Sequence, residues 1–222
     1  MERITIHYVW QALLHFFTHA EDGFLYTSWE MLRQPGRIAI NFIEGKRKNY
    51  QTPVSYFLIW NGIYILLLYI IENSFGENKA VDFTGYFGES EKTKFALSHL
   101  NIVLIALLPF QALYMYLLVL RERYNYMESL VIIFYAIGTV LMLQCVFVVL
   151  AVPVYLFGGF SIDIRYSDIV KIVFISWLTF DLVKLLPLTY KVIRVVMVLI
   201  LTFGTFTLWR SFVYPSVAGL FF

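Results

Sequence analysis

The stretch GKRKNYQTPVSYFLIWNGIYILLLYII, Gly45–Ile71, sets a cluster of three basic residues a few positions before a long apolar run. The run from Pro53 to Ile71 contains no charged residue, and its length is close to the roughly 20 residues that a helix needs to cross a bilayer. Basic residues next to a span favour the anionic cytoplasmic face of a membrane. The stretch therefore predicts a transmembrane helix with a basic cluster at its inner end.

Composition extends this interpretation to the whole chain. Of its 222 residues, 60% are hydrophobic, 19% are aromatic and only 14% are charged. Soluble domains are about half apolar and about a quarter charged, so this chain has too little polar surface to cover its core in water. The single cysteine, Cys145, excludes an intramolecular disulfide and a cysteine zinc site. The sequence predicts an all-α, polytopic membrane helix bundle.

About five apolar segments are predicted to be membrane-spanning helices. Their expected bounds are Pro53–Ile71, Ala96–Leu120, Leu130–Ala151, Ile169–Leu188 and Lys191–Trp209. We expect Pro109 to break the second segment, and the chain to leave the bilayer after Pro153 and the Gly158–Gly159 turn. The fifth segment requires Lys191 and Arg194 to extend their charged ends to the membrane surface.

The basic residues predict the orientation of these spans. Most of the 17 Lys and Arg residues lie before the first span, in the connection between the second and third, or around the connection between the fourth and fifth. With alternating crossings, these three regions share one side of the membrane. The positive-inside rule therefore predicts a cytoplasmic N-terminus and, with five spans, an external C-terminus.

Residues 1–52 are predicted to form a cytoplasmic amphipathic region ahead of a transmembrane domain at residues 53–222. The sequence TSWE has the pattern of a capping box in which Thr27 caps a helix and Glu30 reaches back, and Pro35 must end that helix. After Gly36, polar residues recur at helical spacing opposite an apolar face, which predicts an amphipathic helix lying in the headgroup plane. An apolar stripe near Trp10 repeats this pattern.

Basic side chains of this region are the candidate contacts with anionic phospholipid. They are Arg33, Arg37, Lys46, Arg47 and Lys48. Near an anionic leaflet each contributes about 1 kcal/mol. Two roles fit them: a topology anchor that orients the first span, or a specific site for an acidic headgroup or an acidic partner. Nucleic acid is not an expected partner, because the basic segment is short and adjoins a span.

Polar residues within or beside the predicted spans are candidates for an ion or substrate pathway, since ionisable groups are costly in a bilayer. They are His99, Gln144, Asp181 and Lys184. Asp181 and Lys184 are three residues apart on one helix face, so they can pair, either along a proton path or simply to neutralise each other. His99 fits an interfacial or capping role as well as a proton relay. Gln144 is an amide of the kind that bonds a neighbouring helix.

Two patches carry a family resemblance. The first has an R-x-P-G step, a GKR cluster, an aromatic residue and the proline that opens the first span; the second, RERYNYMESLV, leads into the third span. Both resemble a family of small polytopic membrane proteins, mostly from Bacteroidetes, catalogued as domain of unknown function 3667. The pattern falls on Arg33, Pro35, Gly36, Gly45, Lys46, Arg47, Tyr50 and Pro53, and on Arg121, Tyr126, Glu128, Leu130 and Val131. The chain lacks the family's cysteine-rich zinc ribbon and its histidine cluster early in the third span. The resemblance implies a bacterial inner-membrane setting and no particular reaction.

No enzyme motif accompanies these features. The sequence contains no phosphate-binding loop, no G-x-S-x-G and no H-E-x-x-H, and His15 and His19 lack a third metal ligand. We expect no catalytic residue, cofactor or metal. The expected function is a non-catalytic inner-membrane accessory or scaffold subunit that contacts anionic lipid and packs against other membrane proteins or copies of itself. The alternative is a small oligomeric transporter or channel that uses polar residues of the fourth span, with broken helices at Pro109 and Pro153.

Overall fold

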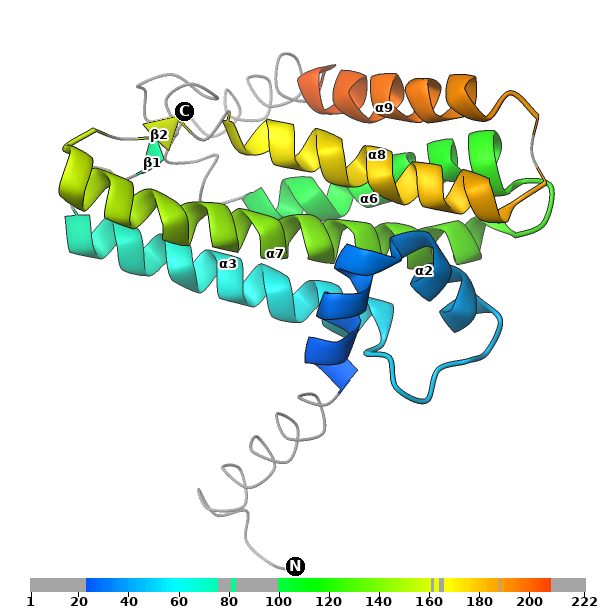
Figure 1. The fold of residues 1–222 in the computed structure, drawn as a ribbon, viewed down its shortest axis with the longest axis horizontal. Coiled ribbons are helices and arrows are strands. Elements are labelled where there is room, and N and C mark those ends of the chain that lie inside the picture. The colour runs from blue at the N-terminus through cyan, green and yellow to red at the C-terminus, as the bar shows by residue number, and fades with distance from the viewer. Residues whose placement is uncertain are drawn as a thin grey trace, which may run out of the picture.

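The computed structural model describes residues 23–75, 81–82, 100–160, 162–163, 166–187 and 189–208. Within them, successive members of five long helical segments run in opposite directions along the bundle (Figure 1). They are α3 (Pro53–Phe75), α6 (Leu100–Met115) continued by the π-helix η1 (Tyr116–Leu120), α7 (Tyr126–Gly158), α8 (Ser167–Leu185) and α9 (Lys191–Leu208). Two-residue strands β1 (Val81–Asp82) and β2 (Ile162–Asp163) pair in parallel, Val81 opposite Ile162. The mostly helical fold confirms the prediction of an all-α chain, apart from the two short strands.

Two of these helices are long and apolar enough to cross a membrane, over Pro53–Ile71 and Tyr126–Gly158. Only 22% and 33% of their most apolar stretches are buried inside the protein. The core helix of a soluble domain would be mostly covered, so the exposure of these two helices is compatible with a membrane protein. In α6 and η1 the apolar helix is shorter, Ala106–Leu120. The described residues therefore support two of the five predicted spans by length and composition.

The long helix α7 forms the centre of the bundle and packs along α3. At Gly138 an added Cβ would lie 2.6 Å from the ring of Tyr56, so only glycine permits this close approach. One residue further, the Thr139 hydroxyl lies 3.1 Å from the Tyr56 hydroxyl and forms a buried hydrogen bond with it. The two helices are thus held by close backbone approach and by one shared polar contact.

The ends of α7 differ from the prediction. The helix begins at Tyr126, because Asn125 and Glu128 form a capping box in which each side chain accepts a hydrogen bond from the other's backbone N–H. It continues through Pro153 and ends at Gly158, and the cap residue Gly159 has a φ of 72°. Pro109 likewise lies inside α6. The expected break at Pro109 is wrong, since a helix tolerates proline where packing and neighbouring groups compensate for the lost hydrogen bond. The expectation that the chain leaves the bilayer after Pro153 stays a prediction.

The N-terminal region is not set apart from the bundle where the structure describes it. A helix at residues 23–33 ends before Pro35, as predicted, and α2 (Pro35–Ile43) begins there with proline in its first turn. The apolar side chains of α2, including Ile38 and Phe42, belong to the same core as α7 and α8. The sequence predicted that the apolar face of α2 meets the headgroup region of a membrane. That prediction is wrong, because this face packs against α7 and α8. The stripe near Trp10 lies outside the described residues.

The predicted cap at Thr27 is also wrong. Thr27 lies within the helix at residues 23–33, and its hydroxyl donates to the Gly23 carbonyl at 2.6 Å. The same hydroxyl accepts a hydrogen bond from the backbone N–H of Gln51 at 2.9 Å, and the Gln51 carbonyl accepts one from the Tyr135 hydroxyl. Thr27 therefore joins the first helix to the segment that enters α3, and through Gln51 to α7.

Candidate functional site at the basic end of the bundle

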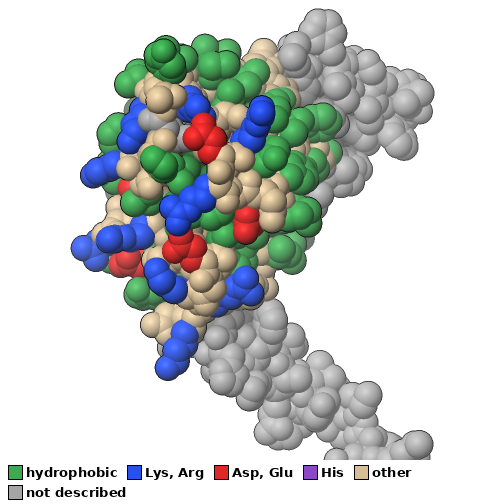
Figure 2. All heavy atoms as spheres, turned by 90° about the vertical axis from the view of Figure 1, so that its right-hand side faces the viewer, with side chains coloured by type: hydrophobic (Ala, Val, Ile, Leu, Met, Phe, Trp, Pro, Cys, Tyr) green, Lys and Arg blue, Asp and Glu red, His purple; other side chains and the backbone are tan. Residues whose placement is uncertain are grey.

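One end of the bundle gathers the basic residues that are scattered in the sequence. The connections after α2, η1 and α8 all lie at the right-hand end in Figure 1, because successive long helices alternate in direction. We call this surface the basic end; its Lys and Arg residues are Arg37, Lys46, Arg47, Lys48, Arg121, Arg123, Lys184, Lys191 and Arg194. Figure 2 shows Lys and Arg side chains spread over this end, with fewer acidic side chains among them and a hydrophobic border.

Asp181 of α8 caps the N-terminus of α2. One of its carboxylate oxygens accepts hydrogen bonds from the backbone N–H groups of Gly36 at 2.9 Å and Arg37 at 3.3 Å. These N–H groups have no partner within their own helix, and the positive end of the helix dipole favours the carboxylate. An added Cβ on Gly36 would lie 2.7 Å from the backbone nitrogen of Leu182. The Pro-Gly step therefore lets α2 meet the backbone of α8 directly.

This contact changes the role predicted for Asp181. Within the described residues, Asp181 forms no ion pair with Lys184, and the Lys184 side chain is exposed. The expected pairing of the two residues is therefore not found. The carboxylate serves to hold α2 on α8, and Lys184 is left as part of the basic end.

The five predicted lipid-contact residues differ in whether their side chains bond to neighbouring groups of the protein. Arg47 donates from Nε to the Phe42 carbonyl at 3.2 Å, and its guanidinium lies 5.0 Å from the centre of the Phe42 ring. Arg37 donates to the Gln34 side chain at 2.8 Å, and Arg33 pairs with Glu30 at 3.5 Å. The other two predicted residues, Lys46 and Lys48, lie on the connection after α2. Lys46 lies beside Glu44, whereas Lys48 is exposed and forms no ion pair within the described chain. Arg47 therefore supports the loop, whereas Lys48 is open to a ligand.

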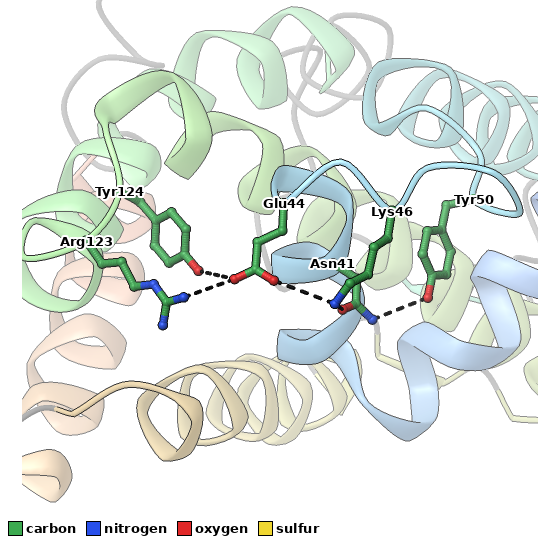
Figure 3. Close-up of polar contacts among 6 residues, drawn as sticks. All are labelled: Asn41, Glu44, Lys46, Tyr50, Arg123 and Tyr124. Atoms are coloured by element: carbon green, nitrogen blue, oxygen red, sulfur yellow. Dashed lines mark hydrogen bonds and ion pairs between the residues drawn. The ribbon is translucent and has the colours of Figure 1, made fainter.

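Glu44 links the N-terminal region to the connection between η1 and α7 (Figure 3). Its carboxylate accepts hydrogen bonds from Arg123 Nη2 at 3.2 Å and from the Tyr124 hydroxyl at 3.3 Å, while Lys46 Nζ lies 3.7 Å away. The Glu44 side chain is 34% exposed, so water and salt screen these contacts, and each is worth at most about 1 kcal/mol. Their contribution is to fix the position of the basic connection after α2.

Tyr124 remains a hydrogen-bond donor over the physiological range. Burial raises the pKa of its phenol, and the Glu44 carboxylate raises it further, whereas the Arg123 guanidinium lowers it. The net direction is upward, so the phenol stays protonated and can donate to the carboxylate. On the other side of the connection, Asn41 Nδ2 donates a weak hydrogen bond to the Tyr50 hydroxyl at 3.5 Å, also drawn in Figure 3.

The structure does not bring the predicted pathway residues together. Gln144 is buried in α7, Asp181 faces α2, Lys184 is exposed, and His99 lies outside the described residues. A void between α6, α7, α8 and α9 measures about 20 Å³, room for about one water molecule. In the described part of the chain, no group of three His, Cys, Asp or Glu residues is placed to hold a metal ion.

Sequence reasoning missed the residues that build this end. Gly36 was recognised only as part of the Pro-Gly step of the family pattern, and Glu44 was not among the candidate site residues. The start of α7 was detectable, since Asn125 and Glu128 have the spacing of a capping box. The pairing of Gly36 with Asp181 had no local signal, because 145 positions separate the two residues.

The fold and this site define a helix bundle whose N-terminal basic segment is docked across one end. Residues 21–65 match the model of a family described as Protein of unknown function (DUF3667). The match includes the helix at residues 23–33, α2, the basic connection and the first part of α3, so the resemblance seen in the first patch is confirmed. The second patch, Arg121–Val131, lies outside the matched residues. No curated protein and no solved structure matches the chain.

Proposed function

We propose that the chain is a non-catalytic integral protein of a bacterial inner membrane, an accessory or scaffold subunit whose basic end contacts anionic phospholipid on the cytoplasmic side. The observation that carries this proposal is the contrast between the flanks and one end of the bundle. The flanks expose apolar side chains along the helices, and the end gathers the cations. A protein with that distribution matches the hydrocarbon core and the anionic surface of a bilayer.

The exposed flanks support membrane insertion. Along α3, Leu66 is 59% exposed and Tyr69 is 65% exposed; along α8, Val173 is 63% exposed; and along α9, Val192 is 73% exposed. Monomeric soluble proteins rarely expose apolar patches larger than a few hundred Å². The exposure of these side chains supports coverage of the flanks by lipid or by other membrane proteins, as an accessory subunit requires.

The docked N-terminal segment supports a scaffold role. Asp181 and Gly36 fix α2 on α8, and Glu44 ties the following connection to the start of α7. These contacts hold the basic connection in one position on the surface of the bundle. The transport alternative gains no comparable support, because the Asp181 carboxylate is engaged by α2 and the void of about 20 Å³ is too small for a path.

The accessory role is tested by purifying the full chain from its native host in a mild detergent and identifying what accompanies it. A second membrane protein at fixed stoichiometry supports a subunit of a complex. Recovery of the chain alone at every detergent concentration contradicts it. Reporter fusions to the connection after α2 test the orientation, and a periplasmic position for that connection contradicts the proposal.

Lipid contact is tested with Lys46, Lys48 and Lys184 changed together to Gln, leaving Arg47 in place because it supports Phe42. The matched control changes the same three lysines to Arg, which keeps the charge. In reconstituted vesicles, spin-labelled phosphatidylglycerol and phosphatidylcholine report which lipid the protein holds at its surface. We expect the Gln variant to lose the preference for phosphatidylglycerol, since each lysine contributes about 1 kcal/mol near an anionic surface. An unchanged preference would refute the contact.

A further inference from the structure

An open groove of about 430 Å³ lies between η1 and the first turns of α9. Its walls are Leu117, Leu118, Tyr190, Ile193, Arg194 and Met197. Ile193, Arg194 and Met197 share one side of α9, and Tyr190 lies directly before that helix, so these residues form one stripe. The volume is within the range of small-molecule sites. Apart from Arg194 and the Tyr190 hydroxyl, the side chains lining it are apolar.

Arg194 is held rigidly at the wall of the groove. It donates to the Leu118 carbonyl at 2.7 Å, to the Thr189 carbonyl at 3.0 Å and to the Glu122 carboxylate at 3.1 Å. Arg194 thus satisfies the Leu118 carbonyl near the C-terminal end of η1. Its side chain contacts the end of η1 and the connection that follows it. The expected extension of Arg194 to the membrane surface stays a prediction.

The backbone on both sides of the groove is unusual. The wall formed by η1 is a π-helix, a form that occurs frequently at functional sites. Tyr190, at the start of the other wall, has a φ of 53°, in the left-handed region that bulky residues rarely adopt. Such strained positions cluster at binding sites. Tyr190 is also 76% exposed, so its ring is accessible from outside.

Two exposed cations adjoin the groove walls in sequence, and we call the end of the groove beside them its mouth. Lys191 begins α9, Arg121 directly follows η1, and both are exposed without an ion pair in the described chain. With Arg194 they make three positive charges beside one carboxylate, that of Glu122, which is already paired. Away from the mouth α9 stays apolar and open, with Ile200 64% exposed. The groove thus offers an apolar channel beside a net positive mouth.

We propose that this groove binds one anionic phospholipid molecule, with an acyl chain along the α9 stripe and the headgroup phosphate at Lys191 and Arg121. The charge at the mouth selects an anionic headgroup, and the apolar walls select a hydrocarbon chain. The first N–H groups of α9 add to the attraction for phosphate. The inference rests on the proposed membrane location and extends the general lipid contact of the basic end to one specific site.

The test uses the full chain in mild detergent, with phosphatidylglycerol and phosphatidylcholine as probes and native mass spectrometry as the readout. We expect wild-type protein to retain one phosphatidylglycerol per chain in preference to phosphatidylcholine. Ile193→Trp fills the groove and should weaken retention by at least about tenfold, the loss of roughly two buried methylene contacts. The control, Val192→Trp, places the same side chain at a 73% exposed position of the same helix, on the face away from the groove, and should retain the lipid.

A second variant addresses the headgroup. Changing Lys191 and Arg121 together to Gln should remove the preference for phosphatidylglycerol over phosphatidylcholine while leaving chain binding. Equal retention by Ile193→Trp and wild type, or no preference between the two lipids in wild type, would overturn the site. If those results occur while the Lys46, Lys48 and Lys184 variant still loses surface lipid preference, the proposed function stands and only the groove assignment fails.

Discussion

Replacing Gly36 by Ala tests the docking of the N-terminal segment directly. The new Cβ would lie 2.7 Å from the backbone nitrogen of Leu182 and 3.0 Å from the carbonyl carbon and a carboxylate oxygen of Asp181. Two of these atoms are backbone, so α2 must move away from α8 to relieve the contact. That movement also lengthens the hydrogen bonds from the first N–H groups of α2 to the Asp181 carboxylate.

The magnitude follows from two opposing effects. Overpacking a close contact costs about 1–3 kcal/mol. Exchanging Gly for Ala in a helix returns about 0.5–1 kcal/mol of backbone entropy. The net loss is about 0.5–2 kcal/mol for the docked state, which speeds opening of α2 by about 2- to 30-fold.

Hydrogen exchange measured by mass spectrometry on the peptide that covers α2 is the suitable assay, because it reports local opening without requiring global unfolding. The matched control is Gly62→Ala on α3, where an added Cβ meets no atom within 4 Å. We expect faster exchange in α2 for Gly36→Ala and no change for Gly62→Ala. If both variants exchange like wild type, the reasoning about the α2–α8 contact is refuted.

Three further predictions concern the same structure. Asp181→Asn weakens the cap on α2 and should speed exchange there a few-fold, since the carboxylate at a helix N-terminus contributes about 0.3–1 kcal/mol, whereas Lys184→Gln should not. The raised pKa of Tyr124 predicts that its bond to Glu44 is intact below the ordinary tyrosine range of about pH 10 and is lost as pH rises through the higher folded value; tyrosinate absorbance of wild type against Tyr124→Phe measures this. Gly138→Ala should lower stability by about 1–3 kcal/mol through overpacking between α3 and α7, seen as a lower Tm in detergent.

Controls accompany these variants. Gly204→Ala on α9, where an added Cβ meets nothing within 4 Å, should leave the Tm unchanged or slightly raised. An equal effect of Lys184→Gln and Asp181→Asn on hydrogen exchange in α2 would support the ion pair predicted from their spacing and contradict the cap. A phenol at Tyr124 that titrates at or below the ordinary tyrosine value would contradict its burial beside Glu44.

The positions of the helices were predictable because they depend on local properties. A run of apolar side chains long enough to cross a bilayer is visible in the sequence, and Pro53 begins α3 as expected. The predictions were wrong where a local sequence pattern is compatible with two different structures. Pro109 can break a helix or lie inside one, and Thr27 can cap a helix or join it to another segment. Only the surrounding packing selects between these outcomes.

The amphipathic pattern of α2 shows the same limit for the site. A helix with one apolar face needs an apolar neighbour, and the sequence cannot tell whether lipid or protein supplies it. The structure supplies α7 and α8, and so converts a predicted membrane-surface helix into a docked one. The basic cluster was recognised correctly as a cluster, but the packing role of Arg47 against Phe42 was not visible.

The sequence by itself determined the apolar helices, their order and the presence of a basic cluster before the first of them, because these features depend on composition and spacing along a short stretch. Tertiary structure alone decided that Asp181 caps α2, that Glu44 holds the connection before α7, and that η1 and α9 enclose a groove. Each of those contacts joins residues more than 70 positions apart, as the 145-residue separation of Gly36 and Asp181 illustrates. No local pattern records such a pairing, since it exists only once the bundle has brought the two segments together.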